Sequence, residues 1–345
     1  MQAIKTNDFI LKGQADFLLA ACVTSTCEIP HLTQAGIEGK IPLTPTLDAE
    51  FISTGKVFSL DDIAETPKGV PTPALITRAV QELIAFKKIQ ILNLGLTHEP
   101  KECNIIDFNI FPTPSIIDKQ PFNAEEIFNK GFEYGNKYKL QGDYLIVGES
   151  TPSGTTTAQA SISAIGYKTK GLFASSFKNS PASIKEEVIQ KALNKLNNNM
   201  SLFEKLGHTA DNMLMFLSGF ILSASRRFNI VLAGGTQMAA VLLIANKIAN
   251  RQAIHHDYRH LHLCTTSWIN NDTNSNIKGL INQLDFRLKA YYADFCFKDS
   301  LHPALKLYDD GEAKEGVGAG ASIAYAYSHA ISQKELTQKI ESFLL

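Results

Sequence analysis

Short apolar runs recur along this chain of 345 residues, and each of them ends at small or hydroxyl-bearing residues. The pattern predicts strands at residues 17–23, 89–94, 144–147, 229–233 and 261–264. These runs are too short for helices, and at least three are apolar at successive positions. Side chains that are apolar on both faces are typical of strands buried in a parallel sheet.

Segments with a helical pattern lie between these runs. Residues 74–87 are amphipathic, residues 183–196 carry Lys and Glu on one side, and residues 238–248 are almost wholly apolar. Strand, turn and helix repeated in this order predict an α/β fold with a doubly wound, mainly parallel, Rossmann-like sheet. Ligands of such sheets bind beyond the carboxyl ends of the strands, where the glycine-containing turns fall.

The two ends of the chain flank the α/β pattern. We expect one α/β domain over residues 16–325. Residues 1–15 and 326–345 are expected to pack together as a small helical subdomain, with a helix within residues 332–345.

Composition and charge mainly exclude certain classes of protein. Hydrophobic residues make up 44% and charged residues 19%, which is usual for a globular protein with a large core. The net charge of -1 gives no basic footprint for nucleic acid or anionic lipid, so we expect a small-molecule partner. The longest apolar run, residues 213–224, is too short to span a bilayer, and no signal-peptide pattern is visible. The five scattered cysteines form no CxxC pair, and we expect a cytoplasmic protein.

One carboxylate near the C-terminus stands directly before three alternating glycines, in the sequence EGVGAG at residues 315–320. An apolar, helix-like run follows. A favourable helix dipole would account for the carboxylate but not for the glycines. The pattern favours a site in which Glu315 is a general base and Gly316 and Gly318 bring backbone close to an anion.

A second turn, GESTPSGTTT at residues 148–157, follows a predicted strand and opens a helix expected to start at about residue 158. Its glycine and hydroxyl residues would offer the amides of Ser153, Gly154 and Thr155 to a phosphate, while Glu149 faces a sugar hydroxyl. The alternative is a plain strand-to-helix turn capped by Ser and Thr.

Weaker signals complete the set of candidates. Gly234 and Gly235 follow a buried strand, where they either approach a ribose phosphate or let a helix pack tightly. Lys185 begins a charged helix and is either a surface residue or a phosphate contact. The histidines of residues 255–262 lack further ligands at suitable spacing, so we predict no metal site.

The three glycine turns, in this order, resemble those of the nicotinate-nucleotide:dimethylbenzimidazole phosphoribosyltransferase family. The likeness covers residues 144–321 and, more loosely, the N-terminal third. PTPALITR at residues 71–78, GTTTA at 154–158 and AGGTQMAA at 233–240 look typical of a variant branch of that family. The segment around Lys185 is similar to the one that bears a phosphate-contacting lysine in the family.

The resemblance implies a pentosyltransferase that moves a phosphoribosyl group from nicotinate mononucleotide to an aromatic base, for assembly of the lower ligand of cobamides (vitamin B12). It implies Glu315 as the general base and Glu149 as an electrostatic stabiliser of the transition state or a ribose contact. It also implies a homodimer that needs no cofactor. The acceptor stays open between 5,6-dimethylbenzimidazole, other benzimidazoles and an adenine-like base. Two alternatives remain: a non-catalytic nucleotide-binding protein of the same fold, and a phosphoribosyltransferase with a different azole or purine acceptor.

Overall fold

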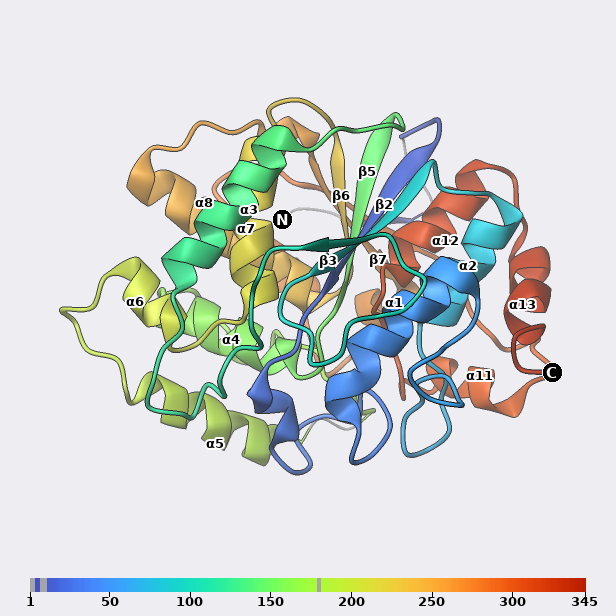
Figure 1. Ribbon diagram of the computed structural model, residues 1–345, viewed down its shortest axis with the longest axis horizontal. Helices are drawn as coiled ribbons and strands as arrows, with labels where there is room; N and C mark the ends of the chain where they lie inside the picture. The colour runs from blue at the N-terminus through green and yellow to red at the C-terminus, as the bar shows by residue number, and fades with distance from the viewer. Residues whose placement is uncertain (1–3, 7–10, 179–180) are drawn as a thin grey trace.

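The computed structural model describes residues 4–6, 11–178 and 181–345, and its centre is a parallel β-sheet (Figure 1). Eight strands pair in the order β1-β8-β7-β6-β5-β2-β3-β4, and every pairing is parallel. The strands are β1 (Ile4–Thr6), β2 (Ala15–Ala21), β3 (Lys88–Asn93), β4 (Ile105–Asp107), β5 (Tyr144–Ser150), β6 (Ile230–Ala233), β7 (Leu261–Thr266) and β8 (Lys289–Ala293). The predicted doubly wound α/β fold is confirmed.

Helices cover both faces of the sheet (Figure 1). The α-helices are α1 (Thr44–Thr54), α2 (Ala74–Leu83), α3 (Ala124–Lys137), α4 (Gly154–Ala164), α5 (Ala182–Leu193), α6 (Leu202–Gly207), α7 (Asn212–Ala224), α8 (Thr236–Gln252), α9 (Ser267–Asn270), α10 (Ile277–Ile281), α11 (Pro303–Asp309), α12 (Ala319–Ser328) and α13 (Gln333–Glu341). Short 3-10 turns are η1 (Ser25–Glu28), η2 (Ile41–Leu43) and η3 (Tyr258–His260).

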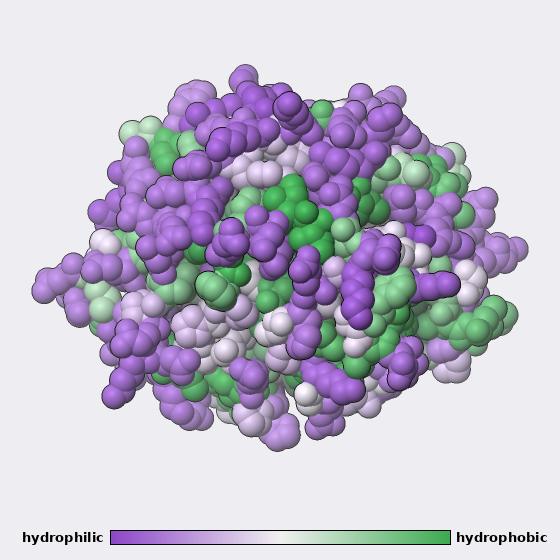
Figure 2. Space-filling model, viewed as in Figure 1, coloured by the Kyte–Doolittle hydropathy of each residue, from purple (hydrophilic) through white to green (hydrophobic). Residues whose placement is uncertain are grey.

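Alternation along the central strands divides the core into two layers. On β5, Leu145 and Val147 belong to the cluster built with α3, α4, α7 and α8. Tyr144 and Ile146 face the cluster built with α1, α2, α12 and α13. Both sets are buried because helices cover both faces, which explains why the strands read as continuous apolar runs. Outside the core, the face in Figure 2 is mostly hydrophilic, with apolar side chains in small patches.

The strand order reverses between β2 and β5. From β2 the chain winds outward through β3 to β4, and from β5 it winds the other way through β6 and β7 to β8. In open sheets of this kind, a crevice forms at the carboxyl ends of the two strands that flank the reversal. We therefore expect a ligand-binding crevice beside the residues that follow β2 and β5.

Helix α4 begins at Gly154, about one turn earlier than the sequence predicted. The segment of residues 154–157 carries glycine and three threonines, which favour turns or strands over helices. Burial overrides this preference, since Thr156 and Thr157 are both buried in the structure. As a result, the predicted phosphate turn lies at the N-terminus of the helix itself.

The terminal segments differ in part from the expected helical subdomain. Ile4–Thr6 form a strand that pairs with β8 rather than a helix, and residues 1–3 and 7–10 lie outside the described residues. The predicted C-terminal helix is present as α13, which packs against α2 with Leu336 and Ile340 buried. The division of the chain at residues 15 and 325 stays a prediction. No helix among the described residues has the length and apolar character to cross a membrane.

Close contact between α12 and β7 leads to a prediction about stability. A Cβ atom added to Gly320 would overlap the backbone of Thr265, which cannot move without disturbing the sheet. We expect Gly320→Ala to lower the free energy of unfolding by about 1–3 kcal/mol through overpacking, measured by urea denaturation. An unchanged unfolding midpoint would contradict this close approach of helix and strand.

Candidate active site

A pocket lies at the carboxyl ends of the central strands, beside the N-termini of α4 and α8. It encloses about 1030 Å³ of space between the lining atoms, part of it open to solvent. The sequence-predicted residues that line it are Glu149, Ser153, Gly154, Thr155, Gly235, Glu315 and Gly316. All three predicted turns thus contribute to one pocket.

Glu315 is held at the N-terminus of α12. Its Oε1 accepts a hydrogen bond from the Gly320 amide at 3.0 Å, and its Oε2 accepts one from the Thr265 hydroxyl at 3.4 Å. Burial raises the pKa of Glu315 to about 7, although the amides of Gly320 and Gly316 oppose this rise. A carboxyl with a pKa near neutrality can exist as an effective base at physiological pH.

The same contacts change the expected role of the third glycine turn. Because the Gly320 amide donates to Glu315, the N-terminus of α12 serves the carboxylate of this chain. Gly316 has φ 148° and Gly318 has φ 76°, conformations that favour glycine. These two glycines therefore shape the loop that presents Glu315.

Glu149 is the penultimate residue of β5 and is 6% exposed. Its Oε2 accepts a hydrogen bond from the side-chain amide of Gln237 at 3.0 Å. Its backbone carbonyl accepts one from the Val317 amide at 2.8 Å, which ties β5 to the loop that carries Glu315. Burial, followed by the charges of Asp211, Glu315 and Asp48, raises the pKa of Glu149 to about 8. The protonated form of Glu149 is thus favoured at pH 7.

The N-termini of α4 and α8 form another wall of the pocket. Ser153 precedes α4 with φ 63°, and its buried hydroxyl has no hydrogen-bond partner within the described part of the chain. Gly235 precedes α8, and the Thr236 hydroxyl accepts from the Ala174 amide at 3.3 Å. The first amides of a helix lack partners within that helix and attract anions. Two such helix ends at one wall make a suitable place for a phosphate.

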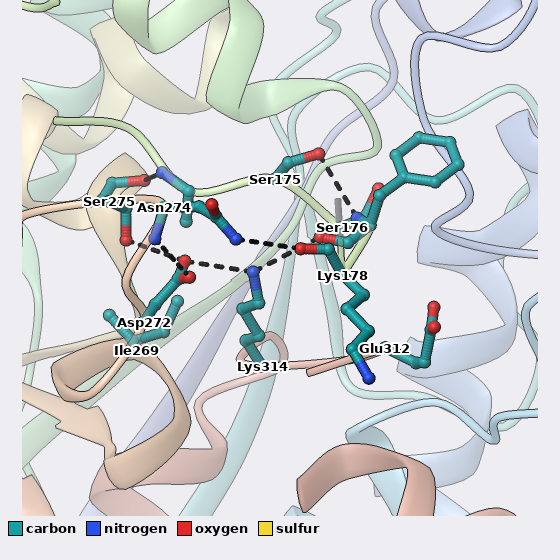
Figure 3. Close-up of polar contacts among 12 residues, drawn as sticks. Ser175, Ser176, Lys178, Ile269, Asp272, Asn274, Ser275, Glu312 and Lys314 are labelled. Carbon is teal, nitrogen blue, oxygen red and sulfur yellow. Dashed lines mark hydrogen bonds and ion pairs between the residues drawn. The ribbon is translucent and has the colours of Figure 1, made fainter. Parts of the chain in front are cut away.

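Two lysines lie close to this wall. Lys185 is 5% exposed, so it is not the surface residue that its charged helix suggested, and its ammonium donates to the Ala174 carbonyl at 3.1 Å. It lies behind the lining of the pocket. Burial and the nearby charge of Lys314 lower the pKa of Lys185 to about 7. Lys314 itself lines the pocket and forms an ion pair with Asp272, as Figure 3 shows. The ammonium nitrogen lies 3.0 Å from the Asp272 carboxylate, and it donates to the Phe177 carbonyl at 3.3 Å.

Comparison with known proteins decides the family. The chain is 34% identical to a UPF0284 protein of Sulfurisphaera tokodaii over 330 residues, covering 94% of this chain and 91% of the relative. It is 33% identical to a UPF0284 protein of Methanocaldococcus jannaschii over 346 residues, covering 99% and 97% respectively. The chain belongs to the UPF0284 family. No protein-family model matches it.

Two solved structures share the fold of this UPF0284 protein. A nicotinate-nucleotide-dimethylbenzimidazole phosphoribosyltransferase from Thermus thermophilus matches with a TM-score of 0.61 and 15% identity, over 96% of this chain and 86% of that one. The CobT structure from the same organism gives a TM-score of 0.60 and 16% identity, over 94% and 84%. The resemblance predicted from the glycine turns is confirmed at the level of the fold.

Three predicted residues of the UPF0284 protein do not line the pocket: Lys185, described above, Gly234 and Gly318. The Gly234 amide donates to the Cys264 carbonyl at 3.0 Å, so it is engaged within the sheet. A Cβ atom on Gly318 would come within 2.9 Å of the Phe17 ring, so this glycine permits close packing beneath the pocket.

Among the polar lining residues of this UPF0284 protein that sequence reasoning missed are Asp48, Gln237 and Lys314. The signal for Asp48 was a carboxylate placed among the apolar positions of the helix that carries Phe51 and Ile52. No spacing rule pointed to Gln237 or Lys314, because their roles depend on partners distant in the sequence, Glu149 and Asp272.

Proposed function

We propose that this UPF0284 protein transfers the phosphoribosyl group of nicotinate mononucleotide to a ring nitrogen of an aromatic base and releases nicotinate. The observation that carries the proposal is the pairing of Glu149 and Glu315, both with raised pKa values, in one pocket beside two helix N-termini. The fold shared with the phosphoribosyltransferase from Thermus thermophilus supports the same reaction class.

The donor phosphate is assigned to the wall formed by α4 and α8. There the Ser153 hydroxyl, the Thr155 amide and the first amides of α8 would bind its oxygens. The Gly154 amide, also predicted as a phosphate contact, instead donates to the Thr151 carbonyl at 2.9 Å. The ammonium groups of Lys185 and Lys314 would add positive charge at the same end. This arrangement leaves the anomeric carbon of the ribose near the two glutamates.

The chemistry then requires one base and no acid. A ring nitrogen of the acceptor attacks the anomeric carbon with its lone pair, while the bond from that carbon to the nicotinate nitrogen breaks. Nicotinate leaves through a neutral pyridine nitrogen, because it takes the bonding electron pair. The acceptor loses its ring N–H proton to the carboxylate of Glu315, which yields a neutral nucleotide base. Attack opposite the leaving group converts the β-nucleotide donor into an α-nucleotide, the type used for the lower ligand of cobamides.

Glu149 is assigned to the developing positive charge. The donor carries a cationic pyridinium ring, and its sugar gains positive character as that ring departs. An adjacent positive charge favours the ionised form of Glu149 and so opposes the rise in its pKa that burial causes. Ionised Glu149 would then stabilise the transition state electrostatically.

The test is release of nicotinate from nicotinate mononucleotide by the purified protein, with 5,6-dimethylbenzimidazole, adenine or no base. Release that depends on the base is the expected result, with the α-nucleotide as the second product. Binding of the mononucleotide without release in any mixture would instead indicate a non-catalytic nucleotide-binding protein.

Lys185 gives a prediction specific to the phosphate. We expect Lys185→Met to lower kcat/KM for nicotinate mononucleotide by about 10- to 100-fold, because it removes a positive charge from behind the wall assigned to the phosphate. In the same variant, kcat/KM for nicotinate riboside, which lacks the phosphate, should change little. Lys191→Met on the same helix is the control, since Lys191 is 58% exposed and pairs with Glu187. Equal losses for both substrates would assign Lys185 a structural role.

A further inference from the structure

The pocket also holds a buried carboxylate that the proposed reaction does not use. Asp48 belongs to α1, is 2% exposed and lines the pocket. Its Oδ1 accepts a hydrogen bond from the Thr72 hydroxyl and its Oδ2 accepts one from the Ser150 hydroxyl, both at 2.6 Å. These contacts fix the carboxylate beside β5, one residue from Glu149.

Apolar side chains join Asp48 in the lining of the pocket. Ala64 and Val70 lie in the segment that leads to Thr72, whose hydroxyl donates to Asp48. Val317, whose amide donates to the Glu149 carbonyl, lines the pocket as well. Such side chains suit the flat, apolar faces of an aromatic base, and a base packed on them would lie beside Asp48.

The charge of Asp48 is not neutralised by the protein. Within residues 4–6, 11–178 and 181–345, no Lys, Arg or His forms an ion pair with it. A carboxylate offers about four acceptor positions, and the two hydroxyl groups use two of them. A buried charge with spare acceptor positions is costly unless a further donor reaches it.

We propose that Asp48 selects the acceptor base by accepting a hydrogen bond from an exocyclic amino group. The inference rests on the proposed function, in which Glu315 takes the ring N–H proton. An acceptor with only a ring N–H group, such as 5,6-dimethylbenzimidazole, supplies one donor for two carboxylates. An aminopurine such as adenine supplies two donors, one on the imidazole ring and one on the exocyclic nitrogen. The preferred acceptor class is thus an amino-substituted azole or purine.

Ionisation of Asp48 is compatible with this role. Burial, opposed by the hydroxyl groups of Ser150 and Thr72, raises the pKa of Asp48 to about 6. At pH 7.5 the carboxyl is therefore mainly ionised and can only accept hydrogen bonds. A base that leaves it without a donor at that pH binds less tightly in the transition state.

The experiment compares adenine with purine, which has the same ring system without the 6-amino group. For the wild-type protein at pH 7.5, we expect kcat/KM for adenine to exceed that for purine by about 10- to 100-fold. In Asp48→Asn, we expect this ratio to fall to within about threefold of unity, because the amide is a weaker acceptor than the carboxylate.

Asp211→Asn is the matched control. Asp211 is also fully buried and also accepts from a hydroxyl, that of Thr157 at 2.5 Å, but it does not line the pocket. Its pKa is likewise raised to about 6, with burial as the main cause. This variant should keep the adenine-to-purine ratio of the wild type.

The outcomes separate the two proposals. No nicotinate release with any base would overturn the proposed function itself. Release at equal rates with adenine and purine would leave that function standing and overturn the selection by Asp48. A ratio that falls equally in both variants would assign Asp48 a structural role. The wild-type comparison needs no variant, so it tests the inference even where Asp48→Asn fails to fold.

Discussion

Replacing Glu315 by Gln is expected to lower kcat by about 10²- to 10⁴-fold while the protein stays folded. Glutamine can still accept from Thr265, but it cannot take the proton that the acceptor base must lose. The loss should appear in single-turnover release of nicotinate as well as in steady state, because it lies in the chemical step. Far-ultraviolet circular dichroism and the thermal midpoint would verify that the fold is kept.

The pH dependence of the wild type supplies a second readout of Glu315. A general base acts only when deprotonated, and the pKa of Glu315 is raised to about 7 by burial. We therefore expect kcat at saturating donor, where the pyridinium charge keeps Glu149 ionised, to fall as the pH drops below about 7. This limb should vanish in Glu315→Gln.

Glu312→Gln is the control for both measurements. Glu312 also lines the pocket, but its carboxylate is held by Lys68 at 2.6 Å. In Glu312→Gln, kcat should fall by no more than about threefold. Near-normal activity of Glu315→Gln, or an equal loss in both variants, would remove Glu315 from the role of base.

Replacing Glu149 by Gln should lower kcat by about 10²- to 10³-fold, as expected for the loss of one electrostatic contact to a developing charge. The variant also distinguishes two roles. Glutamine can still hold a ribose hydroxyl, so a contact of that kind alone would cost less than about tenfold. It cannot supply negative charge opposite the sugar, so the larger loss belongs to electrostatic stabilisation.

Stability gives an independent measure of the same residue. Because the pKa of Glu149 is raised to about 8 in the folded protein, folding favours its protonated form, and this contribution is lost as the pH rises through 8. In the absence of ligand, the thermal midpoint of Glu149→Gln relative to wild type should therefore be higher at pH 8.5 than at pH 6. A constant difference between the two proteins would indicate that the carboxyl is not titrating in this range.

The central strands could be predicted from the sequence because each of them is a continuous apolar run. The apolar runs at β2, β3, β5, β6 and β7 are buried on both faces, so each strand is visible by itself. β1 and β4 have three residues each at the edges of the sheet. Such short edge strands depend on pairing with a neighbour, which no local pattern reveals.

Residues of the candidate site could be predicted only where a single short segment contains the whole motif. Glu315 was predicted because the carboxylate and the three alternating glycines of residues 315–320 lie together in one short segment. The burial of Lys185 could not be read from its charged helix, because the Ala174 carbonyl that it contacts lies in a separate segment. Asp48 is joined to Ser150, which is remote in sequence, and only the folded chain brings the two together.

The hydrogen bond from the Val317 amide to the Glu149 carbonyl has a consequence for synthesis of the protein. It joins the middle of the chain to a loop near its end, and α12 must dock on β7 to hold that loop. A nascent chain that stops before Glu315 can form much of the sheet, yet it lacks that carboxylate, α12 and one wall of the pocket. The pocket is therefore completed last, and truncated or partly folded chains should not bind the ligand that the complete protein binds.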